Sequence, residues 1–303
     1  MALYRPNPPP ARDGVSPSCV VLPTQGRWAT VAEFLIERFH GVPEPVWLQR
    51  LAMGDVVDDE GQQITAQCVY SPLRRLYYYR AVPNERRIPF DEVILWQDEH
   101  LLVVDKPHFL PVLPSGKYLQ ETVLTRLKNR LGVDALSPIH RIDRDTAGLV
   151  LFSIQPATRD AYQALFRERQ VSKTYEAIAP WNPALPWPIR RETRIVQSDH
   201  FMQQMEVEGP PNTLTHIAPL EMLGGLARYE LKPVTGHRHQ LRVHMAALGL
   251  PIVGDGIYPT LTPEGQVDYA RPLQLLAKSI EFVDPLSSLL RRFESRRALA
   301  ALA

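Results

Sequence analysis

The chain has 303 residues, 45% of them hydrophobic, which is long enough for about two globular domains. Its 34 Lys and Arg residues nearly balance 33 Asp and Glu residues, so overall charge neither indicates nor excludes a nucleic-acid partner. Only Cys19 and Cys68 are present, which argues against structural zinc and a disulfide framework. Because the sequence shows no apolar run of about 18 residues and no apolar signal-peptide core, we expect a cytoplasmic protein without membrane contacts.

The N-terminal part predicts a short arm and a small module. Residues 1–22 are rich in proline and lack periodicity, which predicts a disordered or extended arm. Within the module expected over 23–85, Thr30 is a candidate cap for a helix that ends before Gly41. A second short helix is expected around Trp47, followed by a strand and a turn.

The remaining sequence predicts a larger domain over 86–290 and a basic helix or tail over 291–303. Prolines and charged residues at 82–89 indicate a linker before the larger domain. The elements expected in this domain are strands at 93–96, 101–104, 149–153, 174–178 and 227–233, and helices at about 124–131, 156–166 and 241–248. Because a strict βαβ rhythm is missing, we expect an α+β fold: a mixed, largely antiparallel sheet with flanking helices.

The run His140-Arg141-Ile142-Asp143-Arg144-Asp145 sets a carboxylate between two arginines just before an apolar strand. Charged side chains are costly to bury unless they are paired, whereas the apolar residues that follow pull this segment inward. Asp143 is therefore a candidate for chemistry. Asp145 is expected to be a structural turn or cap residue.

A second run, residues 236–245, reads Gly-His-Arg-His-Gln-Leu-Arg-Val-His-Met and leads through a tight turn into a helix. Arg242 projects from an apolar helix face and needs an anion, for which Asp143 is the obvious candidate. A purely structural buried salt bridge is the alternative. Because His237, His239 and His244 lack the spacing of known metallohydrolase motifs, we expect no metal site.

A third run places Lys173 and Tyr175 two residues apart at the start of a predicted strand. They therefore face the same side and could present a cation and a ring to a flat substrate. The alternative is a tyrosine that belongs to the core.

Together these runs resemble the RluA-like pseudouridine synthases, whose signature is roughly His-Arg-Leu-Asp-x-x-Thr-Ser-Gly, then Lys-x-Tyr, then Gly-Arg-x-His-Gln-Leu-Arg-Val-His. The resemblance covers about residues 90–285 and includes Asp105-Lys106-Pro107 and the downstream Gly254-Asp255. It implies that uridine in a structured ribosomal or transfer RNA is isomerised to pseudouridine in a central RNA-binding cleft. It also implies a monomer that needs no cofactor and no metal.

The resemblance further implies roles for single residues. Asp143 would be the catalytic aspartate, Tyr175 would stack on the target uracil, and Arg242 would be the partner of Asp143. Arg141 would fill the space left by the extruded base. Whether Asp143 acts as nucleophile or as base stays open. Other substrate contacts are implied for His140, Lys106, Lys173, Arg238 and Gln240.

The sequence departs from this pattern and leaves alternatives. His237 and Arg238 stand where the family has Arg and a small hydroxyl residue, and Ala147 replaces a serine. The N-terminal module resembles a small α-L RNA-binding module, but its second helix carries only Arg50 as a basic residue, so a structural cap is the alternative. A protein kinase is rejected because its glycine-rich loop and Asp-Phe-Gly are missing. A non-catalytic RNA-binding or assembly protein on the same fold remains the competing function.

Overall fold

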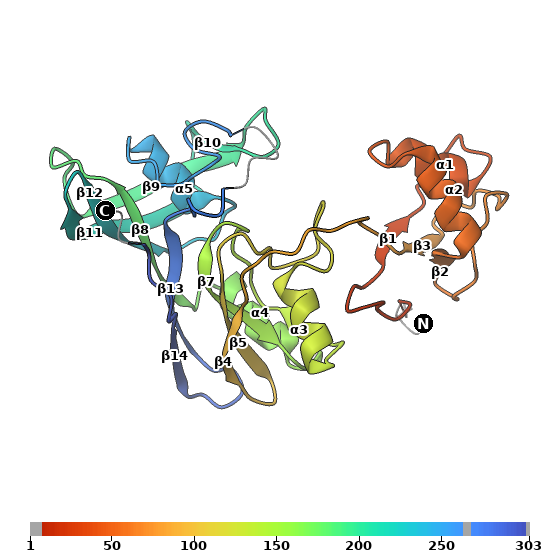
Figure 1. Ribbon diagram of the computed structural model, residues 1–303, viewed down its shortest axis with the longest axis horizontal. Coiled ribbons are helices and arrows are strands. Elements are labelled where there is room, and N and C mark those ends of the chain that lie inside the picture. Colours follow the sequence, from red (N-terminus) through yellow and green to blue (C-terminus); the bar gives the residue numbers. More distant parts are fainter. Residues whose placement is uncertain (1–7, 263–267, 301–303) are drawn as a thin grey trace.

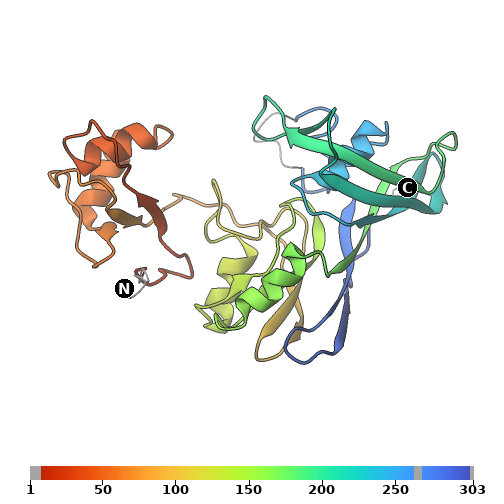
Figure 2. The ribbon, with the colours of Figure 1, turned by 180° about the vertical axis from the view of Figure 1, so that it is seen from behind.

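The computed structural model describes residues 8–262 and 268–300. These residues form a small N-terminal module and a larger domain, and both ribbon views show the module standing to one side of the domain (Figures 1 and 2). The segment before the first strand contacts the larger domain, because the Asn129 side chain donates a hydrogen bond to the Asp13 carbonyl at 3.1 Å. Within the described ranges, no helix is long and apolar enough to cross a membrane.

The N-terminal module packs two helices on a three-stranded antiparallel sheet of order β1-β3-β2. Its elements are β1 (Ser18–Val21), α1 (Val31–Arg38), α2 (Glu44–Met53), β2 (Val56–Asp58) and β3 (Arg75–Tyr78). The Thr30 side chain accepts a hydrogen bond from the Glu33 amide and so caps α1, and Gly54, with a left-handed φ of 74°, ends α2. Both predicted helices are therefore confirmed.

The prediction of a disordered or extended arm over 1–22 is wrong for its last residues. Ser18–Val21 forms β1 and pairs with β3. The proline-rich stretch before β1 made this short strand hard to recognise from the sequence. Exposed and half-buried residues alternate along β1, which is the pattern of a strand with one face on a core. Residues 1–7 of the predicted arm lie outside the described residues.

The larger domain is built on one mixed sheet of 11 strands. Its strands are β4 (Val93–Gln97), β5 (Leu101–Lys106), β6 (Ser137–Pro138), β7 (Ala147–Ser153), β8 (Ser172–Pro180), β9 (Ile189–Gln197), β10 (Gln204–Val207), β11 (Thr213–Leu223), β12 (Leu226–Pro233), β13 (Leu275–Val283) and β14 (Leu290–Glu294). The order is β10-β9-β11-β12-β8-β13-β7-β5-β4, with β14 beside β13 and β6 beside β7. The pairs are antiparallel apart from β13 with β7, which confirms the predicted α+β class and largely antiparallel sheet.

Two helices cover opposite faces of the sheet around β5 and β7. They are α3 (Val123–Leu131) and α4 (Arg159–Arg167). Leu102 and Val104 of β5 share a buried cluster with α3, whereas Leu101 and Val103 share one with α4. Since successive strand residues point to opposite faces, β5 and β7 are buried on both sides. This explains the unbroken apolar runs from which both strands were predicted.

A third helix, α5 (Gln240–Ala247), packs against β8 and β12 through Leu241 and Met245. It ends before Gly249, whose φ is 74°. The helix predicted around this segment is confirmed, and its first turn is one wall of the site.

The C-terminal residues do not form the basic helix or tail predicted over 291–303. Leu290–Glu294 is strand β14, which pairs with β13, and the next residues fasten to the domain. The Asp105 carboxylate accepts hydrogen bonds from the Ser295 hydroxyl and the Arg296 amide, both at 2.8 Å. Apolar residues alternate too weakly in this arginine-rich stretch to signal a strand. Residues 301–303 lie outside the described residues.

Candidate active site

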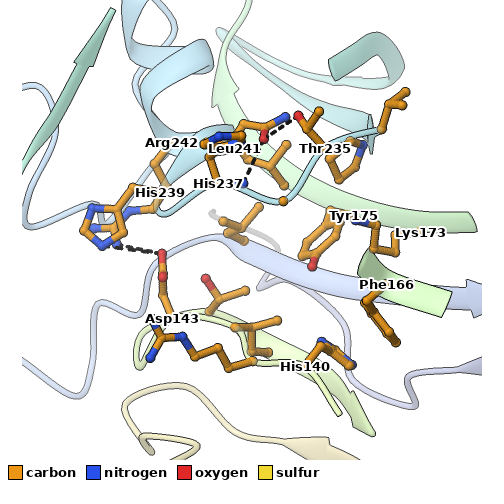
Figure 3. Close-up of a pocket in the computed structure, with 18 of the residues that line it drawn as sticks. His140, Asp143, Phe166, Lys173, Tyr175, Thr235, His237, His239, Leu241 and Arg242 are labelled. Atoms are coloured by element: carbon orange, nitrogen blue, oxygen red, sulfur yellow. Dashed lines mark hydrogen bonds and ion pairs between the residues drawn. The ribbon is translucent and has the colours of Figure 1, made fainter. Parts of the chain in front are cut away.

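A cavity of about 420 Å³ lies where the loop before β7, the end of α4, strand β8 and the first turn of α5 meet (Figure 3). Its wall includes Asp143, Tyr175 and Arg242, which come from three separate sequence runs. The structure thus brings together the three residues that were expected to carry the chemistry. It also places His140, Arg141, Lys173 and Gln240 on the wall, but not Lys106 or Arg238.

The loop that carries Asp143 is fixed at its downstream end by Gly148. This glycine has a φ of 106°, and a Cβ atom there would overlap the backbone carbonyl of Ala277 in β13. Because Ala277 pairs with Gly148 where β13 runs parallel to β7, the close approach of two backbones requires glycine. Asp143 is thereby presented at the edge of a rigid sheet, with 29% of its side chain exposed.

Arg242 connects Asp143 to a second carboxylate. Its Nε and Nη2 atoms donate to the two oxygens of Asp255 at 2.8 and 2.6 Å, and its Nη1 donates to Asp143 Oδ2 at 3.2 Å. Burial alone lowers the pKa of Arg242, but the hydrogen bonds and charge of Asp255, with the charges of Asp143 and Asp145, more than offset it. The net result is a pKa above the ordinary value, so the guanidinium stays charged.

Asp255 is the site residue that sequence reasoning missed. It was noted only as part of a Gly-Asp pair, and nothing in a spacing of 13 residues from Arg242 signals that the two side chains meet. Its carboxylate also accepts hydrogen bonds from the amides of Ile257 and Tyr258 at 2.8 and 3.0 Å. Asp255 is therefore held in place by two backbone amides, and it in turn orients Arg242.

His239 was considered only as a metal ligand, but it lies beside Asp143. It is the N-cap residue of α5, with a left-handed φ of 56°, and its ring lines the cavity. Its Nε2 is 3.8 Å from Asp143 Oδ2, and its Nδ1 is 3.0 Å from the Tyr258 hydroxyl. Burial lowers the pKa of His239. The charge of Asp143 opposes this shift and the charge of Arg242 adds to it, and the net pKa is lowered, so the ring is mostly neutral near pH 7.

The other two histidines of this run lie apart from Asp143. His237 lines the cavity, whereas His244 is fully buried and contacts the hydroxyls of Thr213 and Thr215 at 3.0 and 2.9 Å. Burial lowers the pKa of His244 to about 4. In residues 8–262 and 268–300, no group of three or more His, Cys, Asp or Glu side chains could hold a metal ion.

Tyr175 and Lys173 lie on one face of β8, as their spacing predicted, and both line the cavity. The Tyr175 ring packs on the core cluster that includes Leu241 and Leu275, and it lies between Asp143 and Lys173 in Figure 3. Burial and the charge of Asp143 raise the pKa of the Tyr175 hydroxyl, so it is neutral. A rigid aromatic face is thus presented beside a carboxylate.

His140 stacks on Phe166, with ring centroids 4.5 Å apart and planes at 15°. Its Nε2 accepts a hydrogen bond from the Leu151 amide at 3.2 Å. Burial and the nearby Lys173 lower its pKa to about 3, so this ring is neutral at physiological pH. Arg141 is exposed on the rim next to it.

The expectation that Lys106 contacts substrate directly is wrong, because its side chain is fully buried behind the site. Its Nζ donates to the carbonyls of Pro107 and Arg144 at 2.9 and 2.8 Å. Burial lowers its pKa to about 7, against the opposing charges of Asp145 and Asp143. Lys106 therefore supports the loop that carries Asp143.

Gln240 lines the cavity but has its polar atoms engaged by the protein. Its Oε1 accepts from the Thr235 hydroxyl and the His237 amide at 2.8 and 3.1 Å, and its Nε2 donates to Leu214 and Thr215. It braces the tight turn rather than offering atoms to a substrate, which corrects the expected contact. The physical reason is that the turn leaves buried polar groups to be satisfied.

Arg238 lies outside the cavity lining and donates to the Phe201 carbonyl at 2.9 Å, so its contact with an RNA substrate stays a prediction. Asp145 lies in a bend before β7, which agrees with the structural role expected for it, and its side chain pairs with Arg144 at 2.8 Å. Desolvation raises the pKa of Asp145, but the charge and hydrogen bonds of Arg144 reverse this and keep the pKa below its ordinary value.

Comparisons with known proteins agree on one family. Residues 100–247 match the family model described as RNA pseudouridylate synthase. The dual-specificity RNA pseudouridine synthase RluA of Salmonella typhi is 33% identical over 205 residues, which cover 64% of this chain and 87% of that protein. The mitochondrial tRNA pseudouridine(32) synthase of Saccharomyces cerevisiae is 27% identical over 77% of this chain, which spans 51% of that protein.

Solved structures agree with this. The human RNA pseudouridylate synthase domain containing 4 is 27% identical, with a TM-score of 0.54, over 68% of this chain and 88% of that one. The human RNA pseudouridylate synthase domain containing 1 has a TM-score of 0.56 at 23% identity over 68% of this chain and 84% of that one, which shows a shared fold.

Proposed function

This chain belongs to the RluA-like pseudouridine synthase family, and from that premise we propose that it isomerises uridine in structured ribosomal or transfer RNA with Asp143 as the catalytic carboxylate. One observation carries the assignment of Asp143. Among the residues that line the cavity, Asp143 is the one carboxylate, and it faces an aromatic ring while a buried arginine holds one of its oxygens.

The proposed reaction needs groups of these kinds. The bond between N1 of uracil and C1′ of ribose breaks, the ring turns, and a bond forms between C5 and C1′. The proton on C5 is lost and N1 gains one, so the reaction is a net isomerisation. An ionised Asp143 could attack as a nucleophile or start cleavage as a base, and both routes use the same carboxylate.

The target base must leave its helical stack before Asp143 can reach it, at a cost of a few kcal/mol. We propose that stacking on Tyr175 offsets part of this cost, and that the exposed Arg141 fills the space that the base leaves. Arg242 is the positioning partner of Asp143, and Lys173 adds positive charge near the substrate phosphates.

The N-terminal module is proposed to act as a structural cap rather than as an RNA-binding module. The Arg50 guanidinium, the basic group that α2 offers, lies over the ring of Trp47 at 5.0 Å. Burial lowers the pKa of Arg50, which indicates that this side chain is partly taken up by the module's own core. These contacts favour packing over phosphate binding.

The proposal is tested by incubating the purified full chain with cellular RNA that carries tritium at C5 of uracil. Isomerisation releases that tritium to water, so we expect release that depends on the protein. The competing function, a non-catalytic RNA-binding or assembly protein, predicts RNA binding without release. Mapping pseudouridines in RNA from cells with and without the protein then identifies the target uridine.

A further inference from the structure

The cavity continues past Tyr175, away from Asp143, into a second end. This distal end is formed by His140, Phe166, Arg169 and Lys173. Figure 3 shows Lys173 and Phe166 on the far side of Tyr175 from Asp143, with His140 below Tyr175 and close to Phe166. The carboxylate and its arginine therefore occupy only one end of the cavity, and of the residues at the other end only Lys173 has a role in the proposed function.

The distal end carries positive charge that the protein does not neutralise. Arg169 and Lys173 are close enough that burial and the charge of Arg169 together lower the pKa of Lys173. In the described part of the chain, neither side chain forms a salt bridge with a carboxylate, whereas the neighbouring Arg167 pairs with Asp160 at 3.4 Å. Two adjacent cations in a cavity repel each other unless an anion joins them.

The backbone of Arg169 supplies an independent observation. Its φ is 60°, in the left-handed region that favours glycine at the end of a helix. Here the turn after α4 is closed by the Gln170 amide, which donates to the Leu165 carbonyl at 2.8 Å. Glycine would adopt this turn without the cost of about 1 kcal/mol that a side chain brings. The sequence accepts that strain and places a guanidinium on the rim of the cavity.

An aromatic wall lies beside the two cations. Phe166 and His140 stack nearly in parallel, and the neutral His140 ring adds no charge to the wall. A flat, apolar surface next to paired cations fits a nucleotide, whose base stacks and whose phosphate is anionic. The same surface offers no carboxylate or imidazole free to bind a metal ion.

We propose that the distal end is a second nucleotide subsite, in which Arg169 and Lys173 bind the phosphodiester next to the target uridine and Phe166 and His140 face the adjoining nucleotide. This inference rests on the proposed function, because it assumes that RNA enters the cavity. It adds to that function a fixed position for one backbone phosphate relative to Asp143.

The test measures how the full chain binds a stem-loop RNA with an all-uridine loop. Asn tolerates a left-handed backbone, so Arg169→Asn removes the charge with little added strain. Arg169→Lys keeps the charge, and Arg292→Asn removes an exposed arginine of β14 that does not line the cavity. These two variants are the matched controls.

We expect Arg169→Asn to bind about tenfold more weakly. The slope of log affinity against log salt concentration should become shallower by about 0.7, the value for one lost phosphate contact on a single strand. Arg169→Lys and Arg292→Asn should stay close to the unmutated chain. An unchanged slope in Arg169→Asn, or an equal change in Arg292→Asn, would overturn the subsite.

A second measurement tests the phosphate itself. Neutral methylphosphonate linkages on either side of the modified uridine should weaken binding of the unmutated chain more than binding of Arg169→Asn, which keeps only the Lys173 contact. Equal losses in both proteins would contradict the proposed contact. The readouts separate the two proposals: absence of tritium release refutes isomerisation, whereas the affinity and salt slope of Arg169→Asn judge the subsite alone.

Discussion

Arg242 donates two hydrogen bonds to Asp255, at 2.8 and 2.6 Å, but only one, at 3.2 Å, to Asp143. Asp255 therefore fixes the plane of the guanidinium, and Asp143 is held through a single oxygen. Its other oxygen is free of this partner, and 29% of the side chain remains exposed to the cavity. The arrangement suits a carboxylate that must be oriented and yet reach a substrate.

Arg242→Lys tests this division of labour. An ammonium cannot reproduce the two-pronged contact with Asp255 and also reach Asp143, so Asp143 loses its fixed position. We expect turnover to fall by about 100-fold while RNA affinity changes little. Single-turnover kinetics measure the effect, with circular dichroism to establish folding. Turnover at the unmutated rate would remove Arg242 from the mechanism.

Asp255→Asn tests the support behind Arg242. It leaves a buried guanidinium with weaker pairing, so we expect the free energy of unfolding to fall by about 3 kcal/mol and turnover to fall with it. Urea denaturation measures the first effect. Asp199→Asn, at an exposed position, is the matched control. Unchanged stability and turnover in Asp255→Asn would show that Arg242 needs no second carboxylate.

The sequence predicted the helices and the apolar strands β5 and β7 well, because caps and continuous apolar runs are local signals. Thr30 caps its helix, as was predicted for it. Strands β9, β10, β11, β13 and β14 of the larger domain were among those missed. Strand β9, for example, reads Ile-Arg-Arg-Glu-Thr-Arg-Ile-Val-Gln, and only one of its faces is buried. Strand identity there depends on neighbours far along the chain.

For the site, too, local sequence predicted some residues and not others. Asp143, Tyr175 and Arg242 were identified through motifs, and the fold brings them into one cavity. The pairing of Arg242 with Asp255 depends on the course of the loop after α5, and the place of the Lys106 side chain depends on its hydrogen bond to the Arg144 carbonyl, 38 residues away. Neither is a property of local sequence.

Tyr175 is predicted to act through its ring rather than its hydroxyl. Tyr175→Phe keeps the stacking face and should retain turnover within a few-fold. Tyr175→Leu loses that face, and since stacking on one base contributes about 1–3 kcal/mol, kcat/KM should fall by about 10- to 100-fold. Steady-state tritium release measures both variants. Similar activity in Tyr175→Leu and the unmutated chain would exclude stacking.

Lys106 predicts a pH dependence of stability. Its pKa is about 7 in the folded chain against an ordinary value of 10.5. As pH falls from 10.5 toward 7, Lys106 binds a proton in the unfolded chain but not in the folded chain. The free energy of unfolding therefore decreases as pH falls through this range and increases as pH rises. Relative to Lys106→Met, the chain should gain about 2 kcal/mol between pH 7 and 9. Parallel stability curves for both proteins would contradict a neutral buried lysine.

The central claim is that Asp143 is the catalytic carboxylate, and Asp143→Asn tests it most directly because the amide has nearly the same shape and cannot act as nucleophile or base. Tritium release from RNA labelled at C5 of uracil should be abolished, while RNA affinity stays within a few-fold of the unmutated chain. Release at the unmutated rate by Asp143→Asn would contradict the account.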